Sequence, residues 1–303
     1  MNILKEQEAS GSIELLAAQK NIYSRAKNII GIQMLLSFPI AICAAAIVML
    51  KPEFKGYVAI WGLLVVVFDL FVFTPWVKKL RDNAARIQEV FDTKLFELEW
   101  NEIAVGKRPE YELVYEEAKK HGLDAERITA LKKWYPTVID KVPNIFGVII
   151  CQRANIYWDA RMRLRYCLAV RIMLVLIALG VIGYGIYTKK DMFEFLAYIV
   201  APLASTYIFG YRQMMEHGDA ASRLEKLKGF SEKIWSDALD GKDLASIKAK
   251  CRALQDQIFD HRKKSPPIFD FLFKWFRNKS ESLMYKGAEA LVNEYVQRNG
   301  TQQ

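Results

Sequence analysis

The apolar residues of this chain are gathered into long runs arranged as two pairs. The four runs are Ile29–Leu50, Tyr57–Trp76, Leu168–Tyr187 and Met192–Tyr211. Each is close to the roughly 20 residues that a helix, rising about 1.5 Å per residue, needs to cross a hydrocarbon core about 30 Å thick. The runs therefore predict transmembrane helices, and the chain is interpreted as an integral membrane protein.

The connections within the two pairs are short, Lys51–Gly56 in the first and Thr188–Asp191 in the second. Backbone groups in lipid must be satisfied within their own segment, so each pair predicts a helical hairpin. Lysine and arginine gather at the cytoplasmic flanks of membrane spans. The two connections hold only a few lysines, whereas the opposite flanks hold many lysines and arginines. We therefore expect a multi-pass protein with both termini and the central segment in the cytosol.

Outside the spans, apolar residues recur at spacings of three and four, and strand-like alternation is scarce, which predicts helices. We predict an all-α integral membrane protein with four transmembrane helices, formed as two hairpins, and a helical cytosolic domain. The predicted segments are an amphipathic N-terminal cytosolic helix at 1–28, a first transmembrane hairpin at 29–76, a cytosolic helical segment at 77–166, a second transmembrane hairpin at 167–211, and a C-terminal cytosolic helical segment at 212–303 that packs with 77–166.

Glycine, proline and short polar clusters mark where the cytosolic helices should break. The expected breaks are Gly106–Pro109, His121–Asp124, Tyr135–Asn144, Asp240–Lys242 and Ser265–Pro267. The segment Val77–Leu98 holds no such signal, so the second span should continue as one helix beyond Trp76. Asn144–Tyr166 should likewise lead into the third span. Long helices would then join the cytosolic domain to the membrane.

The composition excludes some functions and leaves others open. A net charge of +9 suits either attraction to anionic lipid or a specific anionic ligand, and the two can coexist. The four cysteines and three histidines show no metal-ligand spacing, so neither a metal site nor a disulfide framework is expected. Nucleotide-binding and hydrolase motifs are absent, and paired acidic residues such as Glu116 and Glu117 are interpreted as solvated faces. We expect no enzymatic activity and no cofactor.

Asp69 is a carboxylate inside a predicted span, where it costs on the order of 2.5 to 3.5 kcal/mol unless it is paired, hydrated or protonated. Arg171 lies at a comparable depth in the third span. Three interpretations stay open: a structural pair between Asp69 and Arg171, a pore-lining or gating carboxylate, or a snorkelling arginine beside a hydrated aspartate. Both residues are candidates for a pore or gating role.

The densest polar cluster of the cytosolic part is Cys151–Tyr166. Our candidate ligand contacts in it are Arg153, Trp158, Arg161 and Arg163, because arginine forks match phosphate and aromatic rings stack on bases. The alternative is a juxtamembrane basic helix with an interfacial aromatic anchor. The aromatic segment Pro266–Arg277 is interpreted as buried core or membrane-surface contact, or else as a stacking wall for a ligand.

At these residues the chain resembles a known family, the SMODS-associated four-transmembrane pore-forming effectors of bacterial cyclic-oligonucleotide antiphage signalling. The similar features, spread in order over nearly the whole chain, are Leu15–Lys20 with Tyr23–Lys27; Val90–Phe96 with Trp100 and Asn101; Cys151–Asn155 with Trp158, Asp159 and Arg163–Arg165; and Ser265–Pro267 with Trp275–Arg277.

The resemblance implies an effector of the bacterial inner membrane that senses a cyclic di- or oligonucleotide made by a partner nucleotidyltransferase. Such an effector would then oligomerise or open and permeabilise the membrane. Its partners would be membrane lipid, the cyclic nucleotide and further copies of itself, and we expect no DNA or RNA partner. The alternative from another class is a non-enzymatic scaffold or sensor that binds a protein through its helical cytosolic domain.

Overall fold

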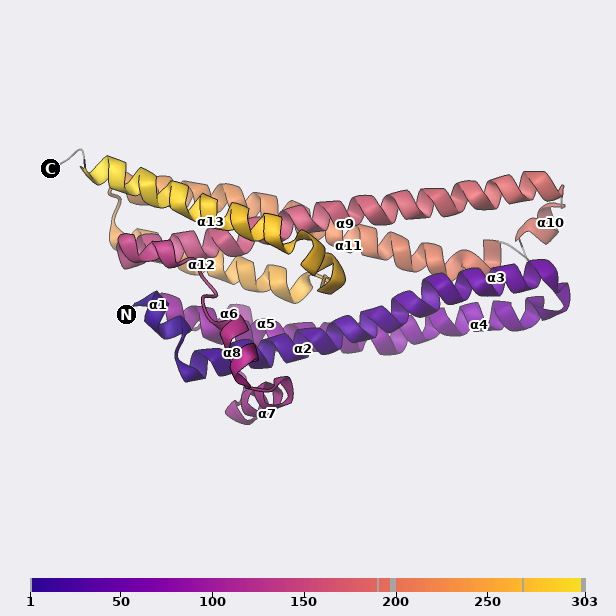
Figure 1. The fold of residues 1–303 in the computed structure, drawn as a ribbon, viewed down its shortest axis with the longest axis horizontal. Coiled ribbons are helices and arrows are strands. Elements are labelled where there is room, and N and C mark those ends of the chain that lie inside the picture. The colour runs from indigo at the N-terminus through magenta and orange to yellow at the C-terminus, as the bar shows by residue number, and fades with distance from the viewer. Residues whose placement is uncertain (1, 190, 197–199, 269, 301–303) are drawn as a thin grey trace. The chain divides into compact units, whose positions relative to one another are not determined.

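The computed structural model describes residues 2–189, 191–196, 200–268 and 270–300. Every regular element in these residues is a helix or a helical turn, which confirms the predicted helical class (Figure 1). The elements are α1 Ile3–Gln7, α2 Ser10–Leu35, η1 Leu36–Ile40, α3 Ala41–Leu50, η2 Pro52–Phe54, α4 Lys55–Phe68, η3 Asp69–Phe73, α5 Thr74–Phe96, α6 Glu102–Val105, α7 Tyr111–His121, α8 Ala125–Leu131, η4 Thr137–Lys141, α9 Asn144–Thr188, α10 Met192–Phe195, α11 Ala201–Leu239, α12 Leu244–Lys264 and α13 Asp270–Gly300.

Two compact units make up the chain. The unit that we call the apolar unit consists of Ala26–Lys79 and Arg163–Asp219, and the unit that we call the polar unit consists of the remaining described residues. Four of the described helices have residues in both units, namely α2, α5, α9 and α11. The chain therefore passes from one unit to the other within regular helices.

Three described helical stretches are long and apolar enough to cross a membrane, Ser10–Val48, Pro52–Phe96 and Asn144–Thr188. The first stretch covers the first predicted span as far as Val48, and the other two contain the second and third predicted spans. The fourth predicted span, Met192–Tyr211, lies partly outside the described residues. The division of the chain into membrane and cytosolic segments stays a prediction.

The predicted continuity of the long helices is confirmed. The second run continues through η3 into α5 as far as Phe96, and the third run continues α9, which begins at Asn144. The N-terminal segment differs from the expected single helix over 1–28. It forms α1 and α2, and α2 runs without a break into the first apolar run.

The polar unit follows the expected pattern of breaks. Helix α12 starts at its N-cap Asp243, whose carboxylate accepts a hydrogen bond from the backbone N–H of Ser246 at 2.9 Å. It ends with four basic residues in its last turn, which suit the negative end of the helix dipole, just before Pro266 and Pro267. Its apolar stripe, Ile247, Cys251, Leu254 and Ile258, is buried, as predicted.

Candidate functional site

A buried polar cluster lies on the helices of the apolar unit. We call Gln33, Asp69, Thr74 and Arg212 the Asp69 cluster. Arg212 Nη1 lies 2.6 Å from Asp69 Oδ2, and Arg212 Nη2 donates a hydrogen bond to Asp69 Oδ1 at 3.0 Å. Gln33 Nε2 donates to Oδ1 at 2.5 Å, and the Thr74 hydroxyl lies 3.4 Å from the same oxygen. The cluster thus joins α2, η3, α5 and α11 through one carboxylate.

Because the Asp69 carboxylate is buried, leaving it without a partner would cost free energy. Asp69 is 7% exposed and begins η3, a π-helical turn between α4 and α5. Such turns are rare in helices and are frequent at functional sites. Removing one partner of a buried ion pair leaves an uncompensated charge, which costs about 3 to 5 kcal/mol in proteins. Asp69 is therefore held by Arg212 and Gln33 in this conformation.

A structural pair between Asp69 and Arg171 was one of the three interpretations left open by the sequence, and the structure does not show this pair. The ion pair of Asp69 is with Arg212, and Arg171 is exposed on α9. Sequence depth alone places Arg171 and Arg212 similarly, because it does not say which helix face points toward Asp69. The available signal was that Arg212 immediately follows the fourth apolar run, close enough for a long side chain to reach back into it.

Further contacts bind α11 to its neighbours in the apolar unit. The Thr206 hydroxyl donates to the backbone carbonyl of Ser37 in η1, the π-helical turn that contains Pro39. Phe38 and Phe209 meet edge to face, with ring centroids 5.7 Å apart. Because Arg212 follows Phe209 by less than one turn, these contacts and the Asp69 cluster hold the same stretch of α11 against the first hairpin.

One predicted ligand contact, Arg163, takes part in the packing of α9 on α11. Its guanidinium lies 3.2 Å from Nδ1 of His217, and its residue is 5% exposed. Tyr166, almost one turn further along α9, lies against the His217 ring with the centroids 4.2 Å apart and the ring planes tilted by 48°, and it donates a hydrogen bond to Gln213. In this conformation Arg163 is buried against α11 and does not present its charge to solvent.

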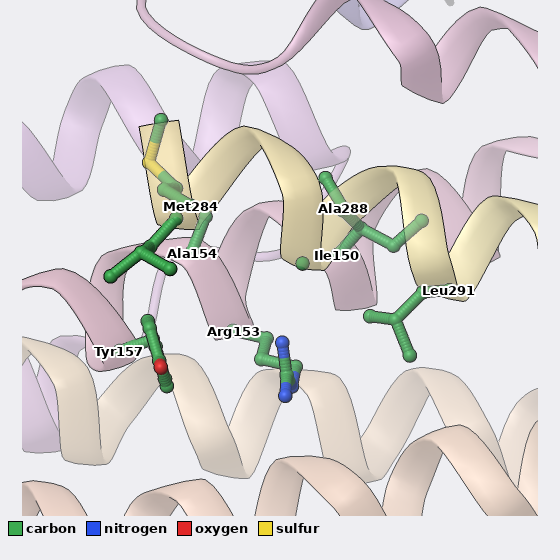
Figure 2. Close-up of a pocket in the computed structure, with 9 residues that line it drawn as sticks. Ile150, Arg153, Ala154, Tyr157, Met284, Ala288 and Leu291 are labelled. Atoms are coloured by element: carbon green, nitrogen blue, oxygen red, sulfur yellow. The ribbon is translucent and has the colours of Figure 1, made fainter. Parts of the chain in front are cut away.

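In the polar unit, α9 and α13 line a cavity of about 110 Å³. Figure 2 shows Arg153 and Tyr157 of α9 beside Met284, Ala288 and Leu291 of α13. The Arg153 guanidinium lies over the Tyr157 ring at 5.7 Å and 3.7 Å from a carboxylate oxygen of Glu232. The cavity therefore combines one cationic fork, one aromatic ring and an apolar wall.

Two of the remaining predicted ligand contacts, Arg161 and Arg163, do not line this cavity. Arg161 is exposed on α9 and does not line it. Trp158 belongs to α9, but its side chain lies outside the described residues, as do the side chains of most of the aromatic segment 266–277. Of the three predicted contacts whose side chains the structure describes, it brings only Arg153 to the cavity.

A second buried network, which the sequence pattern did not predict, lies in the interior of the polar unit. We call Glu89, Asp92, Arg252, Gln255 and Arg262 the Asp92 cluster. Arg262 contacts Asp92 at 2.5 Å, Arg252 contacts Glu89 at 2.7 Å, and Gln255 donates to both carboxylates. Asp92 also accepts a hydrogen bond from the Tyr135 hydroxyl at 2.6 Å. The network joins α5 to α12 and to the segment before α9.

Burial shifts the protonation equilibria of this network. Burial, followed by the nearby charge of Asp92, raises the pKa of Glu89, although Arg252 and Gln255 act in the opposite direction. The pKa of Tyr135 is also raised by burial and by Asp92, so its hydroxyl stays protonated and acts as a donor. Each carboxylate has an arginine partner, which is typical of a structural network.

Another carboxylate departs from the sequence interpretation. Glu117 of α7 was expected on a solvated face, yet it is 3% exposed. Its carboxylate accepts hydrogen bonds from Asn21 at 2.7 Å, Arg25 at 2.9 Å and Lys120 at 2.9 Å. The reason is that α7 packs this face against α2, where Asn21 and Arg25 are available as donors.

Among the described residues, no group of three histidine, cysteine or acidic side chains is placed to hold a metal ion.

Comparisons with known proteins agree on one family. A family model described as the SMODS-associating 4TM effector domain matches residues 1–291. A curated relative from Bacillus cereus (strain VD146), described as a probable CBASS effector molecule, is 27% identical over 286 residues, which cover 92% of this chain and 94% of the relative. No solved structure matches the chain.

Proposed function

This chain belongs to the family of SMODS-associating 4TM effector domains, and from that premise we propose how it acts as a membrane effector in antiphage defence. A cyclic di- or oligonucleotide made by a nucleotidyltransferase binds the polar unit. Binding changes the packing of the apolar unit, which oligomerises or opens and permeabilises the inner membrane. The name of the Bacillus cereus relative, a probable CBASS effector molecule, supports the defence context. No catalytic step is part of this proposal.

The observation that carries the proposal is the continuity of the long helices. Helices α2, α5, α9 and α11 each have residues in both units, so a displacement at one end of a helix is transmitted along its axis. Proteins pass signals between sites through elements that have two discrete arrangements. A ligand that binds the polar unit therefore has four direct connections to the apolar unit.

We place the gate at the Asp69 cluster. Asp69 and Arg212 neutralise each other in this conformation, and Gln33 satisfies a further acceptor site of the carboxylate. If α11 shifts, the pair separates and both charges require water, which favours a hydrated path between the helices. Arg171 stays a candidate residue for the lining of such a path. The centre of a four-helix bundle is filled by its own side chains, so we propose that the path forms between several copies of the chain.

On the ligand side, Arg153, Trp158, Arg161 and Arg163 stay our proposed contacts. Arg153 is supported by the cavity that it lines. Arg163 would have to leave His217 before it could reach a ligand, so it serves the proposal only in an activated conformation. The positive net charge of +9 favours both an anionic ligand and anionic lipid at the cytoplasmic surface, where we place both termini.

Expression in bacterial cells with a voltage-sensitive dye tests the proposed function. The chain is expressed alone, with an active cyclic-nucleotide synthase, and with the same synthase carrying an inactivating substitution. We expect depolarisation only with the active synthase. A chain that causes no depolarisation in any of the three cases would instead be the scaffold or sensor considered above. Equal depolarisation with and without the active synthase would refute control by a nucleotide.

A further inference from the structure

The cavity between α9 and α13 suggests where the ligand binds. We propose that it takes one nucleobase together with the adjoining phosphate of a cyclic nucleotide, with Arg153 on the phosphate and Tyr157 against the base. This inference rests on the proposed function and adds to it the site and the part of the ligand that is read. The evidence comes from Arg153, from the size and lining of the cavity, and from Gly287.

Arg153 has one buried donor that no described residue satisfies. Its Nε is buried and has no hydrogen-bond partner in the part of the chain that the structure describes. Its Nη2 lies 3.7 Å from Glu232, beyond hydrogen-bonding distance, and the Glu232 side chain is 52% exposed. A buried donor without a partner is costly, and a phosphate oxygen would satisfy it with a charge-assisted bond. An anionic ligand would therefore replace a weak contact of Arg153 with a stronger one.

The rest of the lining suits an aromatic ring. Tyr157 provides a flat face, and Met284, Ala288 and Leu291 provide an apolar wall opposite it (Figure 2). The volume of about 110 Å³ is near the size that holds one ring, since an apolar cavity of about 150 Å³ binds benzene. It is smaller than the roughly 300 to 1,000 Å³ of pockets that enclose whole ligands. The cavity thus has the size for one ring, while the phosphate meets the Arg153 guanidinium and the rest of the macrocycle stays outside.

Gly287 of α13 lines the cavity next to the Arg153 guanidinium. A Cβ atom added at Gly287 would lie 3.4 Å from Arg153 Nη1, at the near limit of ordinary van der Waals contact. The α13 backbone therefore passes close to the guanidinium at this position. Because Arg153 is on α9, a ligand held there contacts a helix that continues into the third apolar run.

Binding to the full chain in nanodiscs of uncharged phosphatidylcholine tests the site, because this lipid provides no net anionic surface. The probes are cyclic di-AMP, cyclic di-GMP, cyclic GMP-AMP and cyclic tri-AMP. For the probe that binds the unaltered protein, we expect Arg153→Gln and Tyr157→Leu to raise Kd roughly tenfold to a hundredfold. Arg153→Lys should fall between, because lysine keeps the charge and loses the fork. Tyr157→Phe should bind nearly normally, because it keeps the ring.

Glu232→Gln should change Kd in the opposite direction, a result that simple damage to the fold would not produce. Removing this carboxylate removes the competitor for Arg153, so Kd should fall a few-fold. The matched control for Arg153→Gln is Arg298→Gln, which removes one positive charge as well. Arg298 lies on α13 outside the cavity, where it pairs with Asp240. This substitution should leave Kd within about twofold.

The outcomes separate the site from the function. If the unaltered protein binds a probe and Arg153→Gln, Tyr157→Leu and Glu232→Gln bind it equally well, the cavity is not the site, while the proposed function stands. If Arg298→Gln weakens binding as much as Arg153→Gln, the effect is general charge attraction and the site is refuted. If the unaltered protein binds none of the probes, the ligand part of the proposed function fails, and the site with it.

Discussion

Two buried aspartates on neighbouring helical segments, Asp69 in η3 and Asp92 in α5, are each neutralised by an arginine from a later helix. Their surroundings differ. Asp92 is fully buried beside the core residues Phe91 and Leu95, and Arg262 shares it with Gln255 and Tyr135. Asp69 begins a π-helical turn, and the residues next to it in the sequence, Phe68, Leu70 and Phe71, have exposed apolar side chains.

This difference suggests separate roles for the same chemistry. The Asp92 cluster lies inside a packed core, so breaking it should strongly destabilise the polar unit. The Asp69 cluster lies among helices whose outer faces are apolar, and its arginine is 22% exposed compared with 11% for Arg262. We therefore expect damage to the Asp69 cluster to change membrane permeability more than stability.

The largest expected effect is on the stability of the Asp92 cluster. Asp92→Asn leaves the buried Arg262 charge uncompensated, which should cost about 3 to 5 kcal/mol and lower Tm on the order of 10 °C. Thermal unfolding of the purified protein, followed by circular dichroism, measures it. Asp92→Asn with Arg262→Met should recover part of the loss, because the unpaired charge is removed as well.

The control for this prediction is an exposed pair on the same helix, α12. Asp260 and Lys264 lie 2.8 Å apart but are 39% and 58% exposed. Asp260→Asn should change the free energy of unfolding by no more than about 0.5 kcal/mol. If Asp92→Asn were equally mild, the Asp92 cluster would not stabilise the polar unit and the contrast between the clusters would disappear.

The next effect is on leakage through the membrane. Asp69→Asn should raise ligand-independent leakage of dye from vesicles roughly tenfold, as expected if about 1.4 kcal/mol of the interaction that holds the closed state is lost. Asp69→Asn and Arg212→Gln should be strongly non-additive, because both remove the same ion pair.

The same cycle with Arg171→Gln distinguishes the two arginines. Asp69→Asn and Arg171→Gln should add, because Arg171 is not the ion-pair partner of Asp69. Non-additivity with Arg171 and additivity with Arg212 would mean that the active protein uses the partner expected from the sequence. That result would refute the assignment of the gate to the Asp69 cluster.

The smallest effect concerns an ion cluster of the polar unit in which a nearly buried aspartate contacts two more exposed lysines. Asp237 contacts Lys242 and Lys250 at 2.5 Å each, and hydrogen bonds from Lys242 and then Lys250 lower its pKa from 3.8 to about 2. Because the folded pKa is depressed, the carboxylate stabilises the fold above about pH 4 and loses this effect as the pH falls toward 2. The Tm difference between the unaltered protein and Asp237→Asn should shrink over that range. A difference that did not change with pH would refute the assignment.

Much of the fold could be read from the sequence because its signals are local. Long apolar runs predicted α9, the absence of glycine and proline from Val77–Leu98 predicted the continuation of the second run through α5, and Gly106, Gly122 and Gly241 marked real helix ends with positive φ. The end of α5 was placed only to within two residues. There the helix stops at Phe96 because Glu97 adopts a φ of 53°, a conformation that glutamate does not signal.

The site was less predictable because it depends on which helix faces meet. Hydropathy drew attention to Asp69, but only the packing identifies Arg212 and Gln33 as its partners. Glu89 and Asp92 look like ordinary polar residues of an amphipathic helix until α12 brings Arg252 and Arg262 against them. Arg153 was identified by its chemistry, whereas the α13 side of its cavity comes from a residue range that sequence analysis had not connected with it.

The central claim is that a nucleotide bound by the polar unit opens the apolar unit, and vesicle leakage measured together with binding tests it most directly. The protein is reconstituted in dye-loaded liposomes, and the ligand that binds it is titrated while dye release and bound ligand are recorded. We predict that release and binding reach half-maximum at the same ligand concentration, and that Arg153→Gln shifts both equally. Saturated binding without release, or release without ligand, would contradict the claim.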